Sequence, residues 1–451
     1  MATSSPPGSA SPRDARHLDV LVIGGGPAGA TAAALLAQQG REVVLAERER
    51  FPRPHVGESL QPASLRLLDR HFPGTWEQLA TAGFAYKFGA VYVWGESREP
   101  WTVLFDDRLE KDIDGLSEAD LLAGGYEHAF QVDRATFDQI LLDMARSQGA
   151  EVQERTVVEA LEFDEDTVVG ATLRGPEGAV RVVPRVVIDC SGQRCVVGRK
   201  LGEPETITDL QSTASYGYYE GAGGVPGALG RHVQLVVTIP EGWAWFIPTS
   251  ATRTSVGVVH RRRSRMTRAD FDRSVKEAGL PVDGAVFDED TGLQFSRDWS
   301  FSHRRTSGPN WLLAGDAACF VDPILSGGVD FAIRGAANAA LAVLDAGDGP
   351  LGKAAQSYSR SLRREYQTYL NLARYWYGNN RSVDGFFWQA HEAIDALSGT
   401  TPLRAFVYLT TGHYAADRHL KVFAEWQEQR IFEALGVQQA SAKKVLARKK
   451  R

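Results

Sequence analysis

The sequence predicts an α/β fold in which a Rossmann-type domain carries an inserted mixed β-sheet layer and is followed by a helical C-terminal region. Three observations predict it. A strand, a glycine-rich turn, a helix and a second strand open the chain; short β-branched and aromatic runs fill its middle; apolar residues recur at helical spacing after Ser326. The expected boundaries are a disordered tail at 1–17, the Rossmann-type domain at 18–340 with the interleaved sheet at about 80–130 and 205–300, a helical region at 341–440, and a basic tail at 441–451.

The first motif lies at the start of the chain. Asp19–Ile23 is a short strand that is apolar after its first residue, and Gly24-Gly-Gly26-Pro-Ala-Gly29 satisfies GxGxxG. Residues 30–39 then form a helix of small residues, and Val43–Leu45 is the next strand, which Glu47 closes. A GxGxxG turn alone is a weak signal. In this strand–helix–strand context, with an acid at the second strand's end, it predicts a dinucleotide-binding site.

Each part of this motif has a mechanical reason. Gly24 allows the tight turn, Gly26 lets the backbone approach a pyrophosphate, and Gly29 lets helix and strand pack closely. The helix N-terminus presents free N–H groups to the phosphates, and Glu47 can accept hydrogen bonds from ribose hydroxyls. The residues expected to bind a cofactor here are Gly24, Gly26, Pro27, Ala28, Gly29, Glu47 and Arg48.

The middle of the chain is predicted to form the inserted sheet. Its strands are expected at 212–219, 233–239, 244–248 and 255–260, with a loop at 221–230. Beyond them, a helix is predicted from Val329 to Leu344, because Gly347 and Pro350 stop the pattern, and an aromatic-rich helix at 363–373.

Composition and charge exclude several classes of protein. The 451 residues are 43% apolar and 24% charged, which is typical of a soluble globular protein. A net charge of −6 argues against a nucleic-acid binder. The 3 cysteines, Cys190, Cys195 and Cys319, form no CxxC pair, so we expect no metal site, no disulfide framework and a cytoplasmic location. No apolar run reaches the length of about 18 residues that a membrane helix needs.

Three further segments indicate which cofactor the motif binds. The strand beginning at Asn310 ends in Gly315-Asp316, where an Asp is well placed to bind a ribityl hydroxyl. A second strand ends in Asp189-Cys-Ser-Gly, and Arg134 lies in Val132-Asp-Arg-Ala-Thr-Phe. Together these segments resemble the group A flavin monooxygenase superfamily over most of the chain. The resemblance implies FAD as the cofactor, bound in part by Arg134 and Asp316.

Further motifs narrow the resemblance to the flavin-dependent halogenases. Trp243-Ala-Trp245-Phe-Ile-Pro matches the WxWxIP signature, and Lys87 lies in Gly83-Phe-Ala-Tyr-Lys-Phe-Gly, where halogenases of phenols and pyrroles carry a Lys. The resemblance runs from about Asp19 to about Gly412. Other stretches that carry it are Pro52 with Gly57-Glu58-Ser59-Leu60, Asp322-Pro-Ile-Leu-Ser326-Gly327-Gly328-Val329, Tyr366, Tyr369 and Phe386-Phe-Trp388.

The resemblance implies a reaction and a set of residue roles. Reduced FAD (FADH₂), O₂ and chloride or bromide yield hypohalous acid, and Lys87 holds this oxidant by a hydrogen bond or as a chloramine beside the aromatic substrate. Phe84, Tyr86, Phe88 and Tyr92 are expected to surround Lys87 and lower its pKa. The remaining roles are cofactor binding by Glu58, Ser59, Gly328 and Val329, halide binding by Ser326, Gly327 and Gly328, and separation of substrate from flavin by Trp243 and Trp245.

The resemblance also implies partners. No second GxGxxG for NAD(P)H follows the first, so FADH₂ is expected from a separate NAD(P)H-dependent flavin reductase. The aromatic substrate is free or tethered to an acyl or peptidyl carrier protein. Tryptophan halogenases carry a Glu just before the Ser of the Pro-x-x-Ser-x-Gly segment, where this chain has Leu325. This departure favours a phenol or pyrrole over free tryptophan.

Several alternatives stay open from the sequence alone. Lys87 also fits a surface lysine on a β-edge, Ser326 fits a helix N-cap, and the two tryptophans fit a strand core. The whole chain also fits a halogenase-like hydroxylase or epoxidase, or a non-catalytic flavin-binding partner protein.

Overall fold

The described residues of the computed structural model are 15–94, 98–106, 108–109, 113–202, 204–240, 242–260, 264–297 and 300–378. Most of the predicted N-terminal tail, the segment Phe386–Trp388 and the basic tail at 441–451 lie outside them.

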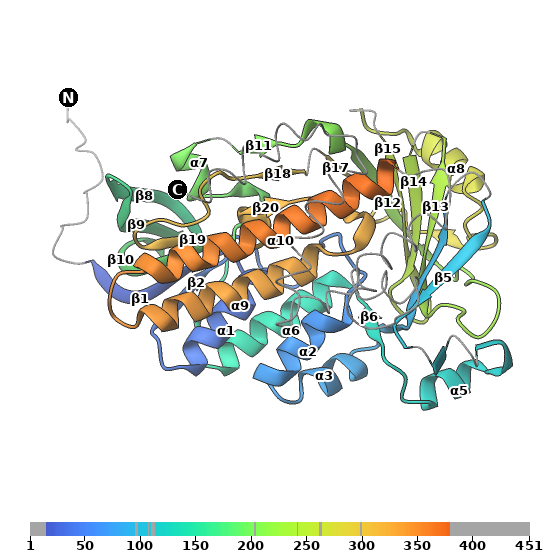
Figure 1. Cartoon of the computed structure of the whole chain (residues 1–451), viewed down its shortest axis with the longest axis horizontal. Coiled ribbons are helices and arrows are strands. Elements are labelled where there is room, and N and C mark those ends of the chain that lie inside the picture. The colour runs from blue at the N-terminus through green and yellow to red at the C-terminus, as the bar shows by residue number, and fades with distance from the viewer. Residues whose placement is uncertain are drawn as a thin grey trace, which may run out of the picture.

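A seven-stranded sheet forms the first layer, in the order β7-β2-β1-β10-β9-β8, with β19 beside β10 (Figure 1). Its strands are β1 (Arg16–Ile23), β2 (Val43–Ala46), β7 (Glu151–Gln153), β8 (Val157–Asp164), β9 (Thr167–Gly175), β10 (Gly178–Asp189) and β19 (Trp311–Leu313). The strands β7, β2, β1, β10 and β19 pair in parallel, and β9 pairs antiparallel with β10 and β8. The parallel core explains why residues 20–23 are apolar at every position, since both faces are covered.

The predicted tail at 1–17 is wrong at its C-terminal end. β1 begins at Arg16, which pairs in register with Val182 of β10. The Arg16 guanidinium forms ion pairs with Glu42 at 2.8 Å and Glu151 at 2.7 Å. Because of these contacts, β1 begins three residues before Asp19, where the apolar run in the sequence suggested that the strand starts.

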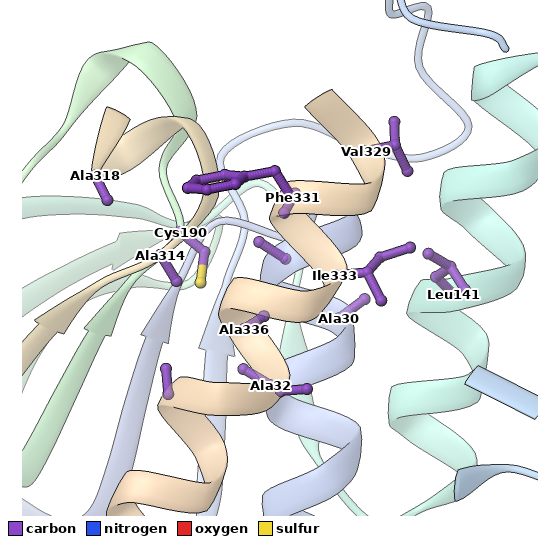
Figure 2. Packing of buried hydrophobic residues seen from close by; sticks show 14 of the residues in the cluster. Ala30, Ala32, Leu141, Cys190, Ala314, Ala318, Val329, Phe331, Ile333 and Ala336 are labelled. Atoms are coloured by element: carbon purple, nitrogen blue, oxygen red, sulfur yellow. The ribbon is translucent and has the colours of Figure 1, made fainter. Parts of the chain in front are cut away.

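Four helices lie side by side along one face of this sheet, in the order α6, α1, α9, α10 (Figure 1). They are α1 (Pro27–Gln38), α6 (Arg134–Ser147), α9 (Gly328–Ala346) and α10 (Gly352–Gly378). Figure 2 shows Ile333 of α9 directed toward Leu141 of α6, with the small side chains of Ala30, Ala32 and Ala336 in the contact between α1 and α9. Small side chains at these positions allow the two helix backbones to approach closely.

An eight-stranded mixed sheet forms the second layer, in the order β16-β12-β15-β14-β13-β4-β5, with β17 beside β12. β4 and β13 pair in parallel, and the other neighbours pair antiparallel. Four strands confirm the runs predicted in the middle of the chain, to within two residues at each end. The strands are β4 (Gly89–Val93), β5 (Pro100–Leu104), β12 (Thr213–Glu220), β13 (Val233–Ile239), β14 (Gly242–Pro248), β15 (Arg253–His260), β16 (Val286–Phe287) and β17 (Gln294–Arg297).

Short elements join the two layers. β3 pairs antiparallel with β6, and β18 lies between β11 and β20. The bounds are β3 (Ala85–Lys87), β6 (Ala129–Gln131), β11 (Glu205–Thr206), β18 (Phe301–Ser302), β20 (Cys319–Phe320), α2 (Pro62–His71), α3 (Thr75–Thr81), α5 (Glu118–Ala123), α7 (Gly198–Leu201) and α8 (Arg268–Glu277).

The C-terminal helices differ from the prediction in extent. The predicted boundary after residue 340 falls inside α9, which ends at Ala346 before Gly347 at a φ of 59°. The helix predicted at 363–373 is part of the longer α10. In its first turns, Ala355, Tyr358 and Leu362 are buried at helical spacing. Because the residues between them are mostly polar, the sequence did not indicate that the helix begins here. Within the described residues, no helix combines the length and the apolar character needed to cross a bilayer.

Candidate active site

The glycine turn between β1 and α1 has a shape that only glycine permits at two positions. Gly24 has a φ of 98°, and a Cβ there would lie 2.5 Å from the carbonyl oxygen of Cys190. A Cβ on Gly29 would lie 1.8 Å from the carbonyl oxygen of Gly24. Gly26 is the N-cap of α1 and supplies no side-chain acceptor, and Pro27 and Ala28 form the buried first turn. The first amides of α1 are therefore left for an external anion, which fits the pyrophosphate of a dinucleotide.

Glu47 fixes this turn from the end of β2. Its buried carboxylate accepts hydrogen bonds from the backbone N–H of Gly25 at 2.6 Å and of Glu49 at 2.7 Å. The side chain of Arg48 is half exposed and pairs with Glu49 at 2.9 Å. The acid thus lies where the sequence placed it, whereas Arg48 points to the surface.

Sequence reasoning missed Arg53. A Cβ added to Gly26 would lie 3.5 Å from the Nη2 atom of Arg53. Its Nη1 atom lies 3.4 Å from a carboxylate oxygen of Asp138, and its Cζ atom lies 4.6 Å from the ring centroid of Phe51. The arrangement places a positive charge beside the glycine turn. An arginine shortly after the second strand of a dinucleotide motif was the available signal.

The buried guanidinium of Arg134 hydrogen-bonds to Asp138 and to the backbone at residues 56–57. Its Nε and Nη2 atoms donate to Asp138 at 2.8 and 3.0 Å, and Nη1 donates to the carbonyl oxygens of Val56 at 2.8 Å and Gly57 at 3.2 Å. Burial raises the pKa of Asp316 to about 6, and the positive charge of Arg134 opposes this rise. Arg134 therefore contributes a buried charge and a fixed backbone rather than a free donor.

Residues 58–60 form the centre of the site. The buried carboxylate of Glu58 accepts a hydrogen bond from the Tyr218 hydroxyl at 2.8 Å. Burial raises the pKa of Glu58 to about 7, although the hydrogen bond from Tyr218 and the charge of Arg134 act in the opposite direction. The Ser59 hydroxyl donates to the side-chain oxygen of Gln234, and the Leu60 carbonyl accepts from Lys87.

Lys87 is a buried lysine, so its interpretation as a surface residue is wrong. It is 1% exposed at the end of β3, and its Nζ atom donates to the Leu60 carbonyl oxygen at 3.0 Å. Nζ lies 5.2 Å from the ring centroid of Phe105. Burial lowers the pKa of Lys87 to about 7. A substantial fraction of the side chain is therefore neutral amine near pH 7.

The expected aromatic surround of Lys87 is partly wrong. The rings of Tyr86 and Phe88 stack on each other at 6.2 Å and both contact His128. Successive residues of an extended segment point to opposite sides, so these neighbours in sequence lie away from the ammonium. Phe105, next to β5, supplies the ring instead.

The 322–328 loop leads into α9. Ser326 has a φ of 52°, and its hydroxyl donates to the Gln234 side-chain oxygen at 2.9 Å. The N-cap of α9 is Gly327, with no side-chain cap, so the interpretation of Ser326 as an N-cap is wrong. A Cβ on Gly327 would lie 2.4 Å from the ring of Tyr369. Among the residues that the structure describes, the first amides of α9, from Gly328 and Val329 onward, receive no cap from the side chain of the N-cap residue.

The two tryptophans of β14 lie on the same face, with ring centroids 5.9 Å apart, and both are buried. The indole N–H of Trp245 donates to the Ser255 hydroxyl at 3.1 Å. The indole N–H of Trp243 donates to the Tyr377 hydroxyl at 2.8 Å, and that hydroxyl donates to Asp322 at 3.0 Å. The end of α10 therefore ties the tryptophan pair to the 322–328 loop.

These contacts divide the predicted site residues into two groups, one at each end of the site. The glycine turn and Glu47 form one end of the site, and residues 58–60, Lys87, the tryptophans and the 322–328 loop form the other. The charge of Arg134 acts on both Glu58 and Asp316, and its ion-pair partner Asp138 also pairs with Arg53 beside the glycine turn, so Arg134 connects the two groups. Sequence reasoning missed Gln234, Tyr218 and Tyr377. Only Gln234 left a signal, as a polar residue within the largely apolar run of residues 233–239.

Comparison with known proteins identifies the chain. The family model described as tryptophan halogenase matches residues 19–119 and 110–450. The chain belongs to the tryptophan halogenase family of flavin-dependent halogenases. A tryptophan 2-halogenase from Chondromyces crocatus is 32% identical to this halogenase over 391 residues, covering 83% of this chain and 70% of the relative. A 1H-pyrrole-2-carbonyl-[peptidyl-carrier protein] chlorinase from Pseudomonas fluorescens is 30% identical over 353 residues, covering 73% and 76%.

Solved structures agree with this assignment. The myxobacterial chondrochloren halogenase, described as a variant of the FAD-dependent halogenases, superposes with a TM-score of 0.74 at 30% identity, covering 89% of this chain and 98% of that one. The flavin-dependent brominase Bmp2 has a TM-score of 0.75 at 24% identity and shows the same fold. The present chain is therefore a flavin-dependent halogenase of aromatic substrates, an oxidoreductase that uses FAD, halide and O₂. The glycine turn, the uncapped α1 amides and the acid at the end of β2 fit FAD.

Proposed function

We propose that this halogenase chlorinates or brominates an electron-rich phenol or pyrrole in natural-product biosynthesis, with the substrate free or tethered to a carrier protein. The observation that carries the proposal is Lys87, which is fully buried and has a pKa lowered to about 7. Two points support the substrate class: one relative acts on a pyrrole bound to a peptidyl carrier protein, and Leu325 stands where tryptophan halogenases carry Glu.

In this proposal FAD contacts both ends of the site, which are the glycine turn at one end and residues 58–59 with the start of α9 at the other. FAD, once bound and reduced, supplies the activation of O₂ that oxidises the halide. Arg48 contributes a charge at the surface rim, and Arg134 contributes a buried charge and a fixed 56–57 backbone. The full set of proposed FAD-binding residues is Gly24, Gly26, Pro27, Ala28, Gly29, Glu47, Arg48, Glu58, Ser59, Arg134, Asp316, Gly328 and Val329.

The halide lies at the start of α9 in this proposal. The proposed halide-binding residues are Ser326, Gly327 and Gly328. The backbone N–H of Ser326 donates to the Pro323 carbonyl oxygen at 2.9 Å, so the N–H groups of Gly327 and Gly328 are the ones offered to the halide, at the start of a helix whose N-cap residue has no side chain. Trp243 and Trp245 form a wall between the aromatic substrate and the flavin. Their indole hydrogen bonds to Tyr377 and Ser255 fix the two rings, so the wall is rigid.

Lys87 delivers the halogen. Its neutral amine can take the halogen from hypohalous acid as N–H is replaced by N–Cl and water leaves, and the arene then exchanges its ring proton for that halogen. Its ammonium form can instead hold hypohalous acid by a hydrogen bond. Both forms are populated near pH 7, since burial places the pKa of Lys87 at about 7.

The test uses the purified protein with FAD, a separate NAD(P)H-dependent flavin reductase, O₂, and chloride or bromide. A panel of phenols and pyrroles, free and carrier-loaded, is followed by mass spectrometry, with free tryptophan as the comparison. The expected product carries one halogen in place of hydrogen, with the isotope pattern of that halogen. A product heavier by one oxygen would contradict the proposal and make the chain an oxygenase.

A further inference from the structure

Gln234 joins two loops of the site that are far apart in the sequence. It lies on β13, is 2% exposed, and its side-chain oxygen accepts hydrogen bonds from the hydroxyls of both Ser59 and Ser326. The two serines lie 175 and 92 residues away along the chain. The Gln234 side chain also hydrogen-bonds to Tyr92 of the adjacent strand β4. Both ends of this buried carboxamide are thus engaged, which fixes its rotamer.

Each serine directly precedes a residue of the proposed site. Ser59 precedes Leu60, whose carbonyl oxygen accepts the hydrogen bond from Lys87. Ser326 precedes Gly327, the N-cap of α9. A shared acceptor therefore sets where the start of α9 lies relative to the acceptor of Lys87.

The Ser326 hydroxyl is used for the hydrogen bond to Gln234 and does not cap α9. Serine is among the preferred side chains for capping a helix N-terminus, and such a cap would occupy an amide of α9. α9 has no side-chain cap because its N-cap residue is Gly327, and the Ser326 hydroxyl instead joins the residue before this N-cap to Gln234.

We propose that Gln234 is a positioning residue for halogenation, which binds Ser59 and Ser326 together and so fixes the halide-binding backbone relative to Lys87. This inference rests on the proposed function, since it assumes that the halide binds at the start of α9. Gln234 touches neither substrate nor cofactor in this role and acts through the two serines.

The test compares Gln234→Leu with Gln131→Leu. Gln131 is also fully buried, faces Ser59 across a β-bridge and donates to the Arg231 carbonyl, so its replacement removes a buried carboxamide close to Ser59 without involving Ser326. Chloride and bromide are titrated into the oxidised, FAD-loaded protein, and binding is followed by the change in the flavin absorption spectrum. We expect halide affinity to fall by about tenfold or more in Gln234→Leu, which corresponds to one lost hydrogen bond to a buried group, and to stay within about twofold of wild type in Gln131→Leu.

Turnover gives a second readout. In Gln234→Leu, KM for halide should rise by about the same factor as the dissociation constant, while KM for the aromatic substrate stays near the wild-type value. A general loss of structure would change both constants together.

Gln234→Glu tests the inference if the Leu variant does not fold. A protonated carboxyl group keeps one carbonyl acceptor for the serines and one of the two donors of the carboxamide, whereas the ionised form loses the donor to Tyr92 and places a negative charge near the start of α9. Its halide affinity, taken relative to wild type at each pH, should recover as pH falls.

The outcomes separate the two proposals. If wild type yields no halogenated product, the proposed function fails. If wild type halogenates but Gln234→Leu keeps the halide affinity of Gln131→Leu, or Gln234→Glu shows no pH-dependent recovery, the role of Gln234 is overturned.

Discussion

The side-chain nitrogen of Lys87 donates a hydrogen bond of 3.0 Å to the carbonyl oxygen of Leu60. Within the described part of the chain, no carboxylate forms an ion pair with this buried nitrogen. The Leu60 carbonyl is a neutral acceptor, so it stabilises the charged form less than a carboxylate would. Desolvation is the cause of the lowered pKa of Lys87, and the site holds an amine that titrates near neutral pH.

Lys87 should make the stability of the protein depend on pH. Its pKa is about 7 in the folded protein and about 10.5 when unfolded, so between these values the unfolded chain binds the extra proton. The free energy of unfolding should therefore rise with pH in this window, by up to about 1.4 kcal/mol per pH unit, and the contribution is lost as pH falls to 7. Urea unfolding of wild type and Lys87→Met at pH 7 and 9 measures this difference. If the difference in free energy of unfolding between the two proteins were the same at pH 7 and pH 9, the lowered pKa of Lys87 would be contradicted.

Glu58 should have a related effect at lower pH. Its pKa is raised to about 7 from an ordinary 4.5, so between pH 4.5 and 7 the folded protein binds the extra proton. The stabilisation is fully present below pH 4.5 and is lost as pH rises through 7. Relative to wild type, Glu58→Gln should therefore become more stable at pH 8 than at pH 5, by about 1 to 3 kcal/mol in the cofactor-free protein. Thermal unfolding at the two pH values measures this change, and an equal difference at both would refute it.

Gly29→Ala should abolish the glycine turn. The added Cβ would lie 1.8 Å from the backbone oxygen of Gly24, so α1 must shift and the protein should lose FAD and about 3 kcal/mol or more of stability. The matched control is Gly335→Ala in α9, where the nearest atom to a Cβ lies 3.8 Å away. That change should stabilise the helix by up to about 1 kcal/mol. FAD titration and thermal unfolding check both variants, and normal FAD affinity in Gly29→Ala would show that the turn relaxes.

Tyr377→Phe should loosen the tryptophan wall. It removes the acceptor of Trp243 and the donor to Asp322, at a cost of about 1 kcal/mol in stability. Less halogenated product per flavin reoxidised is expected, because the wall and the 322–328 loop are no longer tied together. Tyr358→Phe is the control, since it removes another buried hydroxyl of α10, which donates to Leu313 rather than to the site. Equal yields from the two variants would argue against the link.

The glycine turn could be predicted from the sequence because its determinants are local. Gly29 and Glu47 act through neighbours within one strand–helix–strand unit, and Gly24 supplies the positive φ of the turn between β1 and α1, although the atom nearest to a Cβ there belongs to Cys190. The strands of the second sheet were likewise visible as β-branched and aromatic runs. Burial of Lys87 was expected only through resemblance, because a lysine next to aromatic residues on a short strand is also typical of a sheet edge.

The connections between loops could not be predicted in the same way. Gln234 contacts Ser59 and Ser326 only because β13 lies beside two segments that are distant in the sequence, and no local pattern encodes that arrangement. Tyr377 reaches Trp243 across 134 residues, from the end of a helix whose predicted extent was too short. The N-cap assignment of Ser326 was wrong because Ser326 has a φ of 52° and Gly327 is the N-cap, while the Ser326 hydroxyl binds the distant Gln234.

The central claim is that Lys87 transfers the halogen, and one measurement tests it most directly. Wild type, Lys87→Ala and the similarly sized Lys87→Met are each supplied with FAD, flavin reductase, halide, O₂ and the aromatic substrate, and halogenated product is counted per flavin reoxidised. We predict that all three bind and reoxidise flavin alike, while product from both variants falls by about 100-fold or more. Wild-type yields of halogenated product from either variant would contradict the account.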